Sequence, residues 1–137
     1  MTPAALALQK AVYGALITDA GVAALVGDRI FDGPPRNLAF PSVTFGDTRS
    51  ADWSTATEDG AEHRLQLHAW SRERGKAECW AVLDAIRAAL AAGGLEPDGH
   101  ALVNLRFESM DVGQDRDGLT WHGIARFRAV TEPVASP

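Results

Sequence analysis

Apolar residues recur at helical spacing in two long stretches of the chain. In residues 73–92 the spacing is four, three and four, which places the apolar positions along one side of a helix; they are Cys79, Leu83, Ile86 and Leu90. A second stripe of this kind in residues 4–20 consists of Leu8, Val12 and Leu16. The pattern therefore predicts two helices, with a short additional turn of helix over residues 19–26 that Gly27 would end.

Other stretches alternate between apolar and polar residues, as half-buried strands do. Residues 62–71 alternate most clearly, with Leu65, Leu67 and Ala69 on one side, and residues 40–47 are also predicted to form a strand. The segment between them, residues 48–61, is rich in Asp, Ser, Thr and Gly, with Trp53 as its one bulky apolar residue. This composition predicts a long mobile loop or a loose hairpin.

The last two strands, residues 101–113 and 119–131, are predicted to form a hairpin. Each strand carries one apolar row, made of Val103, Leu105 and Phe107 in the first and of Ala125, Phe127 and Ala129 in the second. Both rows share a face only if the loop has an odd number of residues, because a slip of one residue turns every side chain over. A three-residue loop over residues 116–118 pairs Phe107 with Phe127 and ends on a glycine, as such loops favour.

The same register makes a prediction for the polar side of the hairpin. It sets Glu108 opposite Arg126 and Arg106 opposite Arg128. Directly opposed like charges are unfavourable unless an acidic partner lies between them. We therefore expect a charged outer face on this sheet.

Taken together, these elements predict one α+β domain over residues 1–137 in the order α-β-β-α-β-β. The economical arrangement is a four-stranded, mainly antiparallel sheet with two helices packed on one face, because it buries every apolar stripe. Residues 132–137 are expected to be a frayed C-terminal tail.

Composition and charge exclude several classes of protein. The chain has 137 residues, 46% hydrophobic and 23% charged, which is ordinary for a soluble globular domain. Its net charge of −5 and pI near 5.2 argue against a domain that grips duplex DNA, because phosphate neutralisation needs a basic surface. One cysteine, Cys79, cannot form an internal disulfide, and we expect it to be a small buried hydrophobe. Residues 1–5 lack the pattern of a signal peptide, and no stretch is long enough to span a bilayer.

The histidines do not have the spacing of a metal site. His63 and His68 lie five residues apart on one predicted strand, so their side chains should point to opposite faces. His122 has the parity of the polar face, and His100 falls in a predicted turn. Structural zinc needs closely spaced Cys and His ligands, so we predict no metal site.

Two further motifs resemble ligand-binding loops only in part. An EF-hand beginning at Asp115 would need a Glu at its twelfth position, where the chain has Arg126. Gly75 and Lys76 lack the flanking residues of a phosphate-binding loop. No nucleophile elbow or zinc-protease motif is present. We therefore predict no catalytic residue, no cofactor and no enzymatic activity.

Several short blocks, taken in their order and spacing, resemble one known family. They are residues 26–32 (Val-Gly-Asp-Arg-Ile-Phe-Asp), 40–43 (Phe-Pro-Ser-Val), 70–71 (Trp-Ser), 105–108 (Leu-Arg-Phe-Glu) and 121–123 (Trp-His-Gly). The resemblance is to tail-completion or tail-terminator proteins of long non-contractile phage tails and of the related gene transfer agents. It covers nearly the whole chain, and Ser42 departs from it, because an aromatic residue is expected after the Phe-Pro pair.

The resemblance implies a structural part of a particle. Proteins of this kind form a ring, commonly hexameric, at the head-proximal end of the tail tube. The implied partners are other copies of the chain, the major tail tube protein and the neck or head-completion protein, while DNA crosses the central hole without sequence-specific binding. The implied location is the host bacterial cytoplasm during assembly and then the tail–neck junction of a phage or gene transfer agent, with a prophage remnant left open.

The resemblance carries over no site residue, so interface residues are chosen from the sequence itself. Trp53 stands out as a tryptophan in a polar segment, and Arg64 and Arg106 lie on the predicted outer face. We predict that these three residues contact other subunits. Two other classes stay open from the sequence: a small regulatory or binding module of α+β fold, and a small enzyme.

Overall fold

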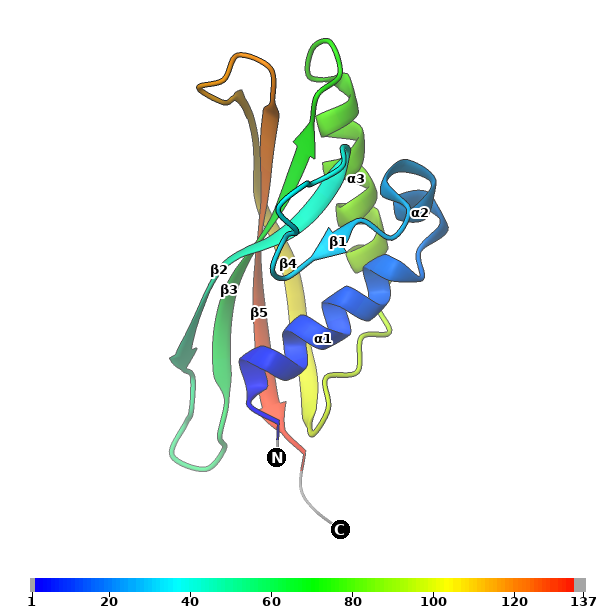
Figure 1. The fold of residues 1–137 in the computed structure, drawn as a ribbon. Helices are drawn as coiled ribbons and strands as arrows, with labels where there is room; N and C mark the ends of the chain where they lie inside the picture. Colours follow the sequence, from blue (N-terminus) through cyan, green and yellow to red (C-terminus); the bar gives the residue numbers. More distant parts are fainter. Residues whose placement is uncertain (1, 135–137) are drawn as a thin grey trace.

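The amphipathic stretches fold as helices that lie together on one side of a sheet (Figure 1). The structure is a computed structural model that describes residues 2–134. Helix α1 spans Ala4–Ile17, α2 spans Ala20–Val26 and α3 spans Ala77–Ala91. The short α2 was expected as a helical turn, and Asp19 caps it by accepting a hydrogen bond of 2.9 Å from the Val22 N–H. The helical layer therefore contains three helices rather than two.

The sheet has five strands instead of the predicted four. They are β1 (Ile30–Phe31), β2 (Ser42–Asp52), β3 (Ala61–Ser71), β4 (His100–Gln114) and β5 (Trp121–Pro133), arranged in the order β1-β2-β3-β5-β4. Strand β1 pairs in parallel with β2, and all other pairs are antiparallel. The sheet is therefore mixed, because the chain that leaves α2 runs along the edge of β2 for two residues before it turns into the loop over residues 32–41.

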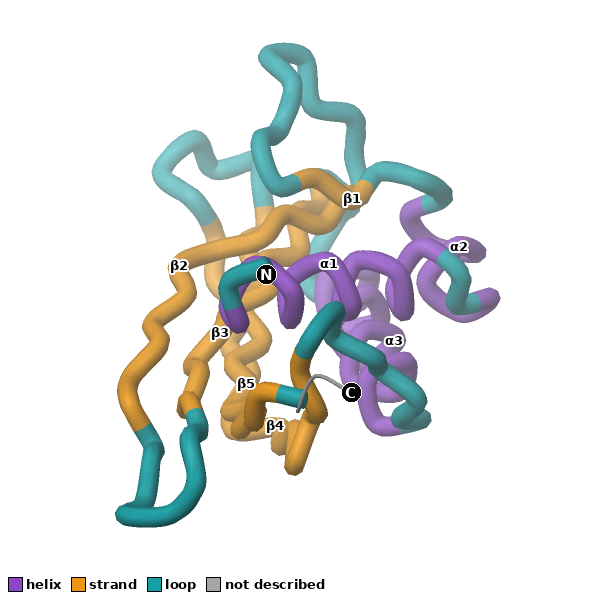
Figure 2. Tube along the Cα trace, turned by 90° about the horizontal axis from the view of Figure 1, so that it is seen from below, coloured by secondary structure: helices purple, strands orange, loops and turns teal. Residues whose placement is uncertain are grey.

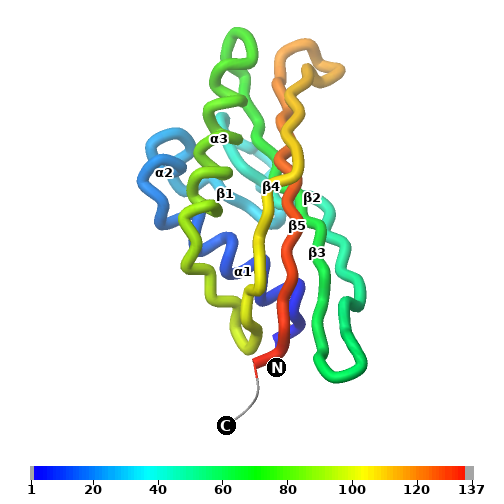
Figure 3. The backbone as a smooth tube through the Cα atoms, turned by 180° about the vertical axis from the view of Figure 1, so that it is seen from behind, coloured from blue at the N-terminus to red at the C-terminus, as the bar shows by residue number. Residues whose placement is uncertain are grey.

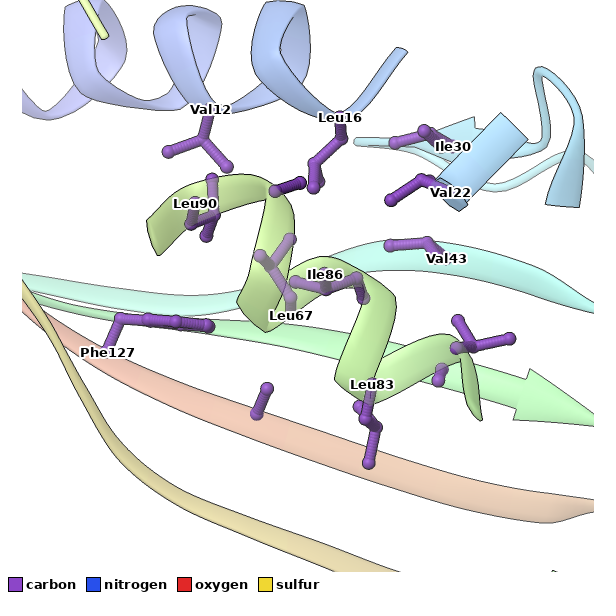
Figure 4. Packing of buried hydrophobic residues seen from close by; sticks show 14 of the residues in the cluster. Val12, Leu16, Val22, Ile30, Val43, Leu67, Leu83, Ile86, Leu90 and Phe127 are labelled. Atoms are coloured by element: carbon purple, nitrogen blue, oxygen red, sulfur yellow. The ribbon is translucent and has the colours of Figure 1, made fainter. Parts of the chain in front are cut away.

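The core lies between the helices and the inner face of the sheet (Figure 4). The predicted stripes of α1 and α3 both face it, and the Leu83 and Ile86 side chains of α3 are fully buried. From the sheet, Leu67 of β3 and Phe127 of β5 point up against α3. Cys79 is also fully buried, as expected, and burial raises the pKa of its thiol to about 11. The thiol is therefore protonated at neutral pH.

The segment predicted as a long mobile loop or a loose hairpin is mostly a hairpin. Strand β2 continues to Asp52 and β3 begins at Ala61, so only residues 53–60 connect them. This hairpin reaches past the helices, as Figures 2 and 3 show from two directions. Its distal part has exposed residues on both sides of β2, so burial imposes no apolar alternation on the sequence there. The register also shifts between Phe45 and Thr48, which interrupts any alternation that could be followed from the start of β2.

The β4–β5 hairpin pairs Phe107 with Phe127 as predicted, but its loop is longer than expected. Gln114 pairs with Trp121, and the Asp115 N–H donates a hydrogen bond of 2.8 Å to the Thr120 carbonyl, so the turn has four residues, 116–119. A register shift between Phe107 and Ser109 compensates for this one additional residue. As a result Ser109, not Glu108, lies opposite Arg126. The predicted three-residue loop was therefore wrong, because a bulge can restore the facing of the apolar rows as well as an odd loop can.

A second irregularity corrects the start and the end of the same hairpin. The register shifts between Leu102 and Asn104. Val103, which was predicted to face the core, is therefore 52% exposed, and Leu102 packs against the core instead. Strand β5 continues through Pro133, and the Val134 N–H donates a hydrogen bond of 3.0 Å to the Gly99 carbonyl. The predicted frayed tail over residues 132–137 is therefore wrong for its first residues, while residues 135–137 lie outside the described part of the chain.

Close contact between α3 and β5 gives a test of this packing. A Cβ atom at Gly123 would lie 2.8 Å from both Cys79 Sγ and Leu83 Cδ1, which are buried atoms of α3. Gly123→Ala should therefore lower the free energy of unfolding by about 1–3 kcal/mol through overpacking. Gly113→Ala is the matched control, because nothing lies within 4 Å of a Cβ atom there. Equal urea midpoints for the two variants would contradict the close approach.

Candidate interaction surface

The side of strands β2–β5 turned away from the helices is here called the outer face. Along β3 the side chains of Leu65, Leu67 and Ala69 enter the core, so those of Arg64, Gln66 and His68 lie on the outer face. The chain has a net charge of −5, yet this face carries five arginines; they are Arg49, Arg64, Arg106, Arg126 and Arg128.

Four of these arginines form one row across the sheet, here called the arginine row. Arg49 of β2 pairs with Arg64 of β3, Arg64 pairs with Arg128 of β5, and Arg128 pairs with Arg106 of β4. Directly opposed residues in antiparallel strands have Cβ atoms about 5 Å apart, where like charges are destabilising. The row therefore needs anionic partners.

Two glutamates neutralise the middle of the row. Glu62 accepts a hydrogen bond of 2.7 Å from Arg128 Nε and lies 3.8 Å from Arg64 Nε. Glu108, which the bulge in β4 displaces, reaches across β5, and both of its carboxylate oxygens lie 2.9 Å from Arg64 Nη1. The opposed pair Arg106 and Arg128 therefore has an acidic partner in Glu62 of β3, which binds Arg128.

The two ends of the row are not neutralised in this way. Within residues 2–134, neither Arg49 nor Arg106 forms an ion pair or a side-chain hydrogen bond. Both residues are exposed, and they belong to opposite sides of the sheet, β2 and β4. Two adjoining hollows of about 240 and 120 Å³ lie beside Arg49 and Arg64, and Arg126 also lines the larger one. The outer face thus offers free guanidinium groups at its edges.

Trp53 belongs to the same surface. It follows the last residue of β2, is 54% exposed, and its ring lies 5.1 Å from the guanidinium carbon of Arg128. A cation–π contact of this kind at an exposed site is worth about 0.5–1 kcal/mol. The indole therefore leaves most of its apolar surface in water.

The structure brings the three predicted interface residues together around one residue that was not chosen. Arg64 and Arg106 both pair with Arg128, and Trp53 lies over it. Arg128 and Arg49 were missed as candidates, although the predicted register already placed Arg128 opposite Arg106. Contact with other subunits stays a prediction for Trp53, Arg64 and Arg106.

A cluster of aromatic rings occupies the outer face beyond the arginine row. Trp70 and His122 stack with ring centroids 3.9 Å apart, and His122 Nε2 lies 2.6 Å from His68 Nδ1. Gly46 leaves room for this arrangement, because a Cβ atom there would lie 2.2 Å from His68 Nε2. Burial lowers the pKa of both histidines, so both rings are neutral at neutral pH. One neutral ring can then donate the hydrogen bond between them and the other can accept it.

The prediction that His63 and His68 face opposite sides is confirmed. His63 is fully buried on the inner side, where its Nδ1 lies 2.6 Å from Ser50 Oγ and its Nε2 lies 2.9 Å from Thr131 Oγ1. Among residues 2–134, no three Cys, His, Asp or Glu side chains come together as metal ligands. Over the same residues, no helix is both long and apolar enough to cross a membrane.

Asp117 organises the tip of the β4–β5 hairpin. Its carboxylate accepts hydrogen bonds from the Leu119 and Thr120 N–H groups and from the Thr120 hydroxyl. These bonds, the hydroxyl bond first, lower its pKa to about 2. Asp117 therefore stabilises the turn itself.

Comparison with known proteins connects this fold to phage tails. Residues 10–132 match the family described as tail completion protein gp17. The chain is 27% identical to tail completion protein gp17 of Bacillus phage SPP1 over 122 residues, which are 89% of this chain and 90% of that protein.

Two solved structures share the fold. A chain in the virion of a native gene transfer agent particle has a TM-score of 0.88 and 33% identity, with 96% of this chain and 99% of that chain covered. The structure of the bacteriophage SPP1 gp17 protein has a TM-score of 0.62 and 24% identity, with 97% and 92% covered.

The family resemblance predicted from the sequence is thereby confirmed, as is the expectation of a structural protein rather than an enzyme. The match runs from residue 10, within α1, to residue 132, one residue before the end of β5. The chain belongs to the tail completion protein gp17 family.

Proposed function

We propose that copies of this chain form a ring at the head-proximal end of a long non-contractile tail tube. The ring, expected to be a hexamer, stops growth of the tube and presents the surface that joins the tail to the neck. Its partners are then other copies of the chain, the major tail tube protein and a neck or head-completion protein. The observation that carries this proposal is the likeness over 96% of the chain to a component of a gene transfer agent virion.

DNA is proposed to pass through the hole of the ring without being held. The net charge of −5 supports this part of the proposal, because tight duplex binding depends on neutralising many phosphates. On the outer face the central arginines are engaged by Glu62 and Glu108, so the arginine row offers phosphates only its two separated ends, Arg49 and Arg106. Assembly is proposed to take place in the cytoplasm of the bacterial host.

Deleting the gene tests the proposal. Without this chain, the tube end keeps an open subunit-binding surface and lacks one that fits the neck, so heads should be filled but unjoined, and tubes irregular in length. Electron micrographs should show loss of nearly all joined particles, and the wild-type gene supplied in trans should restore them. Normal joined particles from the deletion strain would refute the proposal.

A further inference from the structure

The free ends of the arginine row call for an anionic partner outside the monomer. Arg106 lies on β4, which forms one edge of the sheet. At the other side, β1 covers β2 only at Val43 and Thr44, so β2 itself forms the edge at the level of Arg49. The two unneutralised arginines are therefore placed where neighbouring molecules would approach the sheet.

The chain carries a suitable anionic group on the loop over residues 53–60. This loop holds Glu58 and Asp59, follows Asp52, and no lysine or arginine lies between Arg49 and Arg64. Within the described residues, Glu58 and Asp59 form no ion pair. Figures 1 and 3 show the loop projecting beyond the body of the molecule, beside β2. It is an acidic projection at the edge opposite to Arg106.

We propose that Glu58 and Asp59 of one copy bind Arg106 of the next copy. This contact rests on the proposed ring. In a ring with head-to-tail interfaces, one edge of each subunit faces the opposite edge of its neighbour. The β2 edge with its acidic loop then meets the β4 edge with Arg106.

The heights of the two groups along the strands differ by a distance that the loop can bridge. Arg49 lies three residues before Asp52 at the base of the loop, and the pairing of strands carries that level across the sheet to Arg106. Three residues of strand span about 10 Å, a distance that an eight-residue loop can cover by folding toward its neighbour. A rotation about an axis along the strands leaves this offset unchanged between one copy and the next, so the loop must fold back by about that distance to reach Arg106.

A protein carboxylate fits these arginines better than the phosphates of DNA. The row is interrupted by Glu62 and Glu108, which would repel a continuous polyanion but leave single guanidinium groups free. Complementary charges of this kind chiefly set which surfaces meet and in what register. We therefore assign the contact to a second copy of the chain.

Site-directed cross-linking in assembled particles tests the contact. Asp59→Cys and Arg106→Cys are made in separate, differently tagged copies that are expressed together in the producing host. The native Cys79 is fully buried and should not react. A short bismaleimide should join the two variants into a mixed dimer, while neither variant alone should cross-link. Arg49→Cys paired with Asp59→Cys is the matched control and should give at least 10-fold less product, because Arg49 lies on the same side of the sheet as the loop.

Charge reversal gives a second measurement. Arg106→Glu should lower the yield of joined particles, and Asp59→Arg in the same chain should restore much of it, with unchanged thermal unfolding as the check on folding. Particles that contain both cysteine variants but no mixed dimer would overturn the contact and leave the ring intact. A chain absent from the particles altogether would overturn the proposed function and the contact with it. Binding of duplex DNA by the wild-type chain, lost in Arg106→Glu without any 59–106 cross-link, would assign the face to DNA and overturn the proposal.

Discussion

Trp53→Ala should reduce the yield of joined particles at least about 10-fold while the isolated chain unfolds at nearly its original temperature. The side chain is 54% exposed and touches the fold mainly through Arg128, so its loss removes little internal contact. A buried tryptophan at a subunit interface is typically worth ~2 kcal/mol or more, and about 1.4 kcal/mol corresponds to a tenfold change in affinity. Every copy in a ring would lose this contact.

Trp80→Ala provides the matched control for this prediction. Trp80 is 42% exposed but lies on α3, on the opposite side of the sheet from Trp53. The control should join tails normally, and both variants should shift the melting temperature by a few degrees at most, since about 1 kcal/mol corresponds to roughly 2–4 °C for a domain somewhat larger than this one. If Trp53→Ala instead unfolds the isolated chain, the indole belongs to the core and has no interface role.

Elements that bury one face were predictable from the sequence. Helix α3 and strand β3 follow their apolar periodicities closely, because each lies between the core and solvent along its whole length. The pairing of Phe107 with Phe127 was also predictable, because both must face α3. An element that is buried on one side only has a periodic pattern of apolar residues, which can be recognised in the sequence.

Elements without a buried face were not predictable. The distal part of β2 projects beyond the helices, and its polar residues look like those of a loop. Strand β1 has two residues, too few for any period to show. The bulge before Ser109 adds one residue to β4, which offsets the longer turn and leaves the facing of the apolar row unchanged.

The interface candidates show the same limit. Trp53, Arg64 and Arg106 were chosen one at a time, and the structure places them on one face around Arg128. Seeing the arginine row required the pairing of four strands, and a one-residue error in any pair would have scattered it. Glu108 was predicted to pair with Arg126, and it contacts Arg64 instead because of the bulge.

Acidification from pH 7 to pH 5 should destabilise the protein, because three of its histidines are held neutral by the fold. Burial lowers the pKa of His63, His68 and His122 below the ordinary 6.5; His122 lowers that of His68 further, and Asp47 and Asp115 only partly oppose these effects. Below about pH 6.5 the unfolded chain then binds protons that the folded chain does not. The free energy of unfolding therefore decreases as the pH is lowered. Each histidine contributes at most about 1.4 kcal/mol per pH unit.

The two aspartates with lowered pKa do not contribute to the change in stability between pH 7 and pH 5. Asp52 and Asp117 have pKa values below the ordinary 3.8, about 2 for Asp117, because both accept hydrogen bonds. Their contribution to stability is present above about pH 4 and is lost only as the pH falls further toward 2. The change between pH 7 and pH 5 therefore reports mainly on the histidines.

Urea unfolding at several pH values measures this effect, and His122→Phe separates its parts. The phenyl ring can keep the stacking on Trp70, while one titrating group and the hydrogen bond to His68 are removed. The loss of unfolding free energy between pH 7 and pH 5 should then be smaller than in the wild-type chain, because fewer histidines take up a proton when the chain unfolds. A wild-type stability that stays level or rises over this range would show that the three rings titrate normally in the fold, and that burial does not hold them neutral.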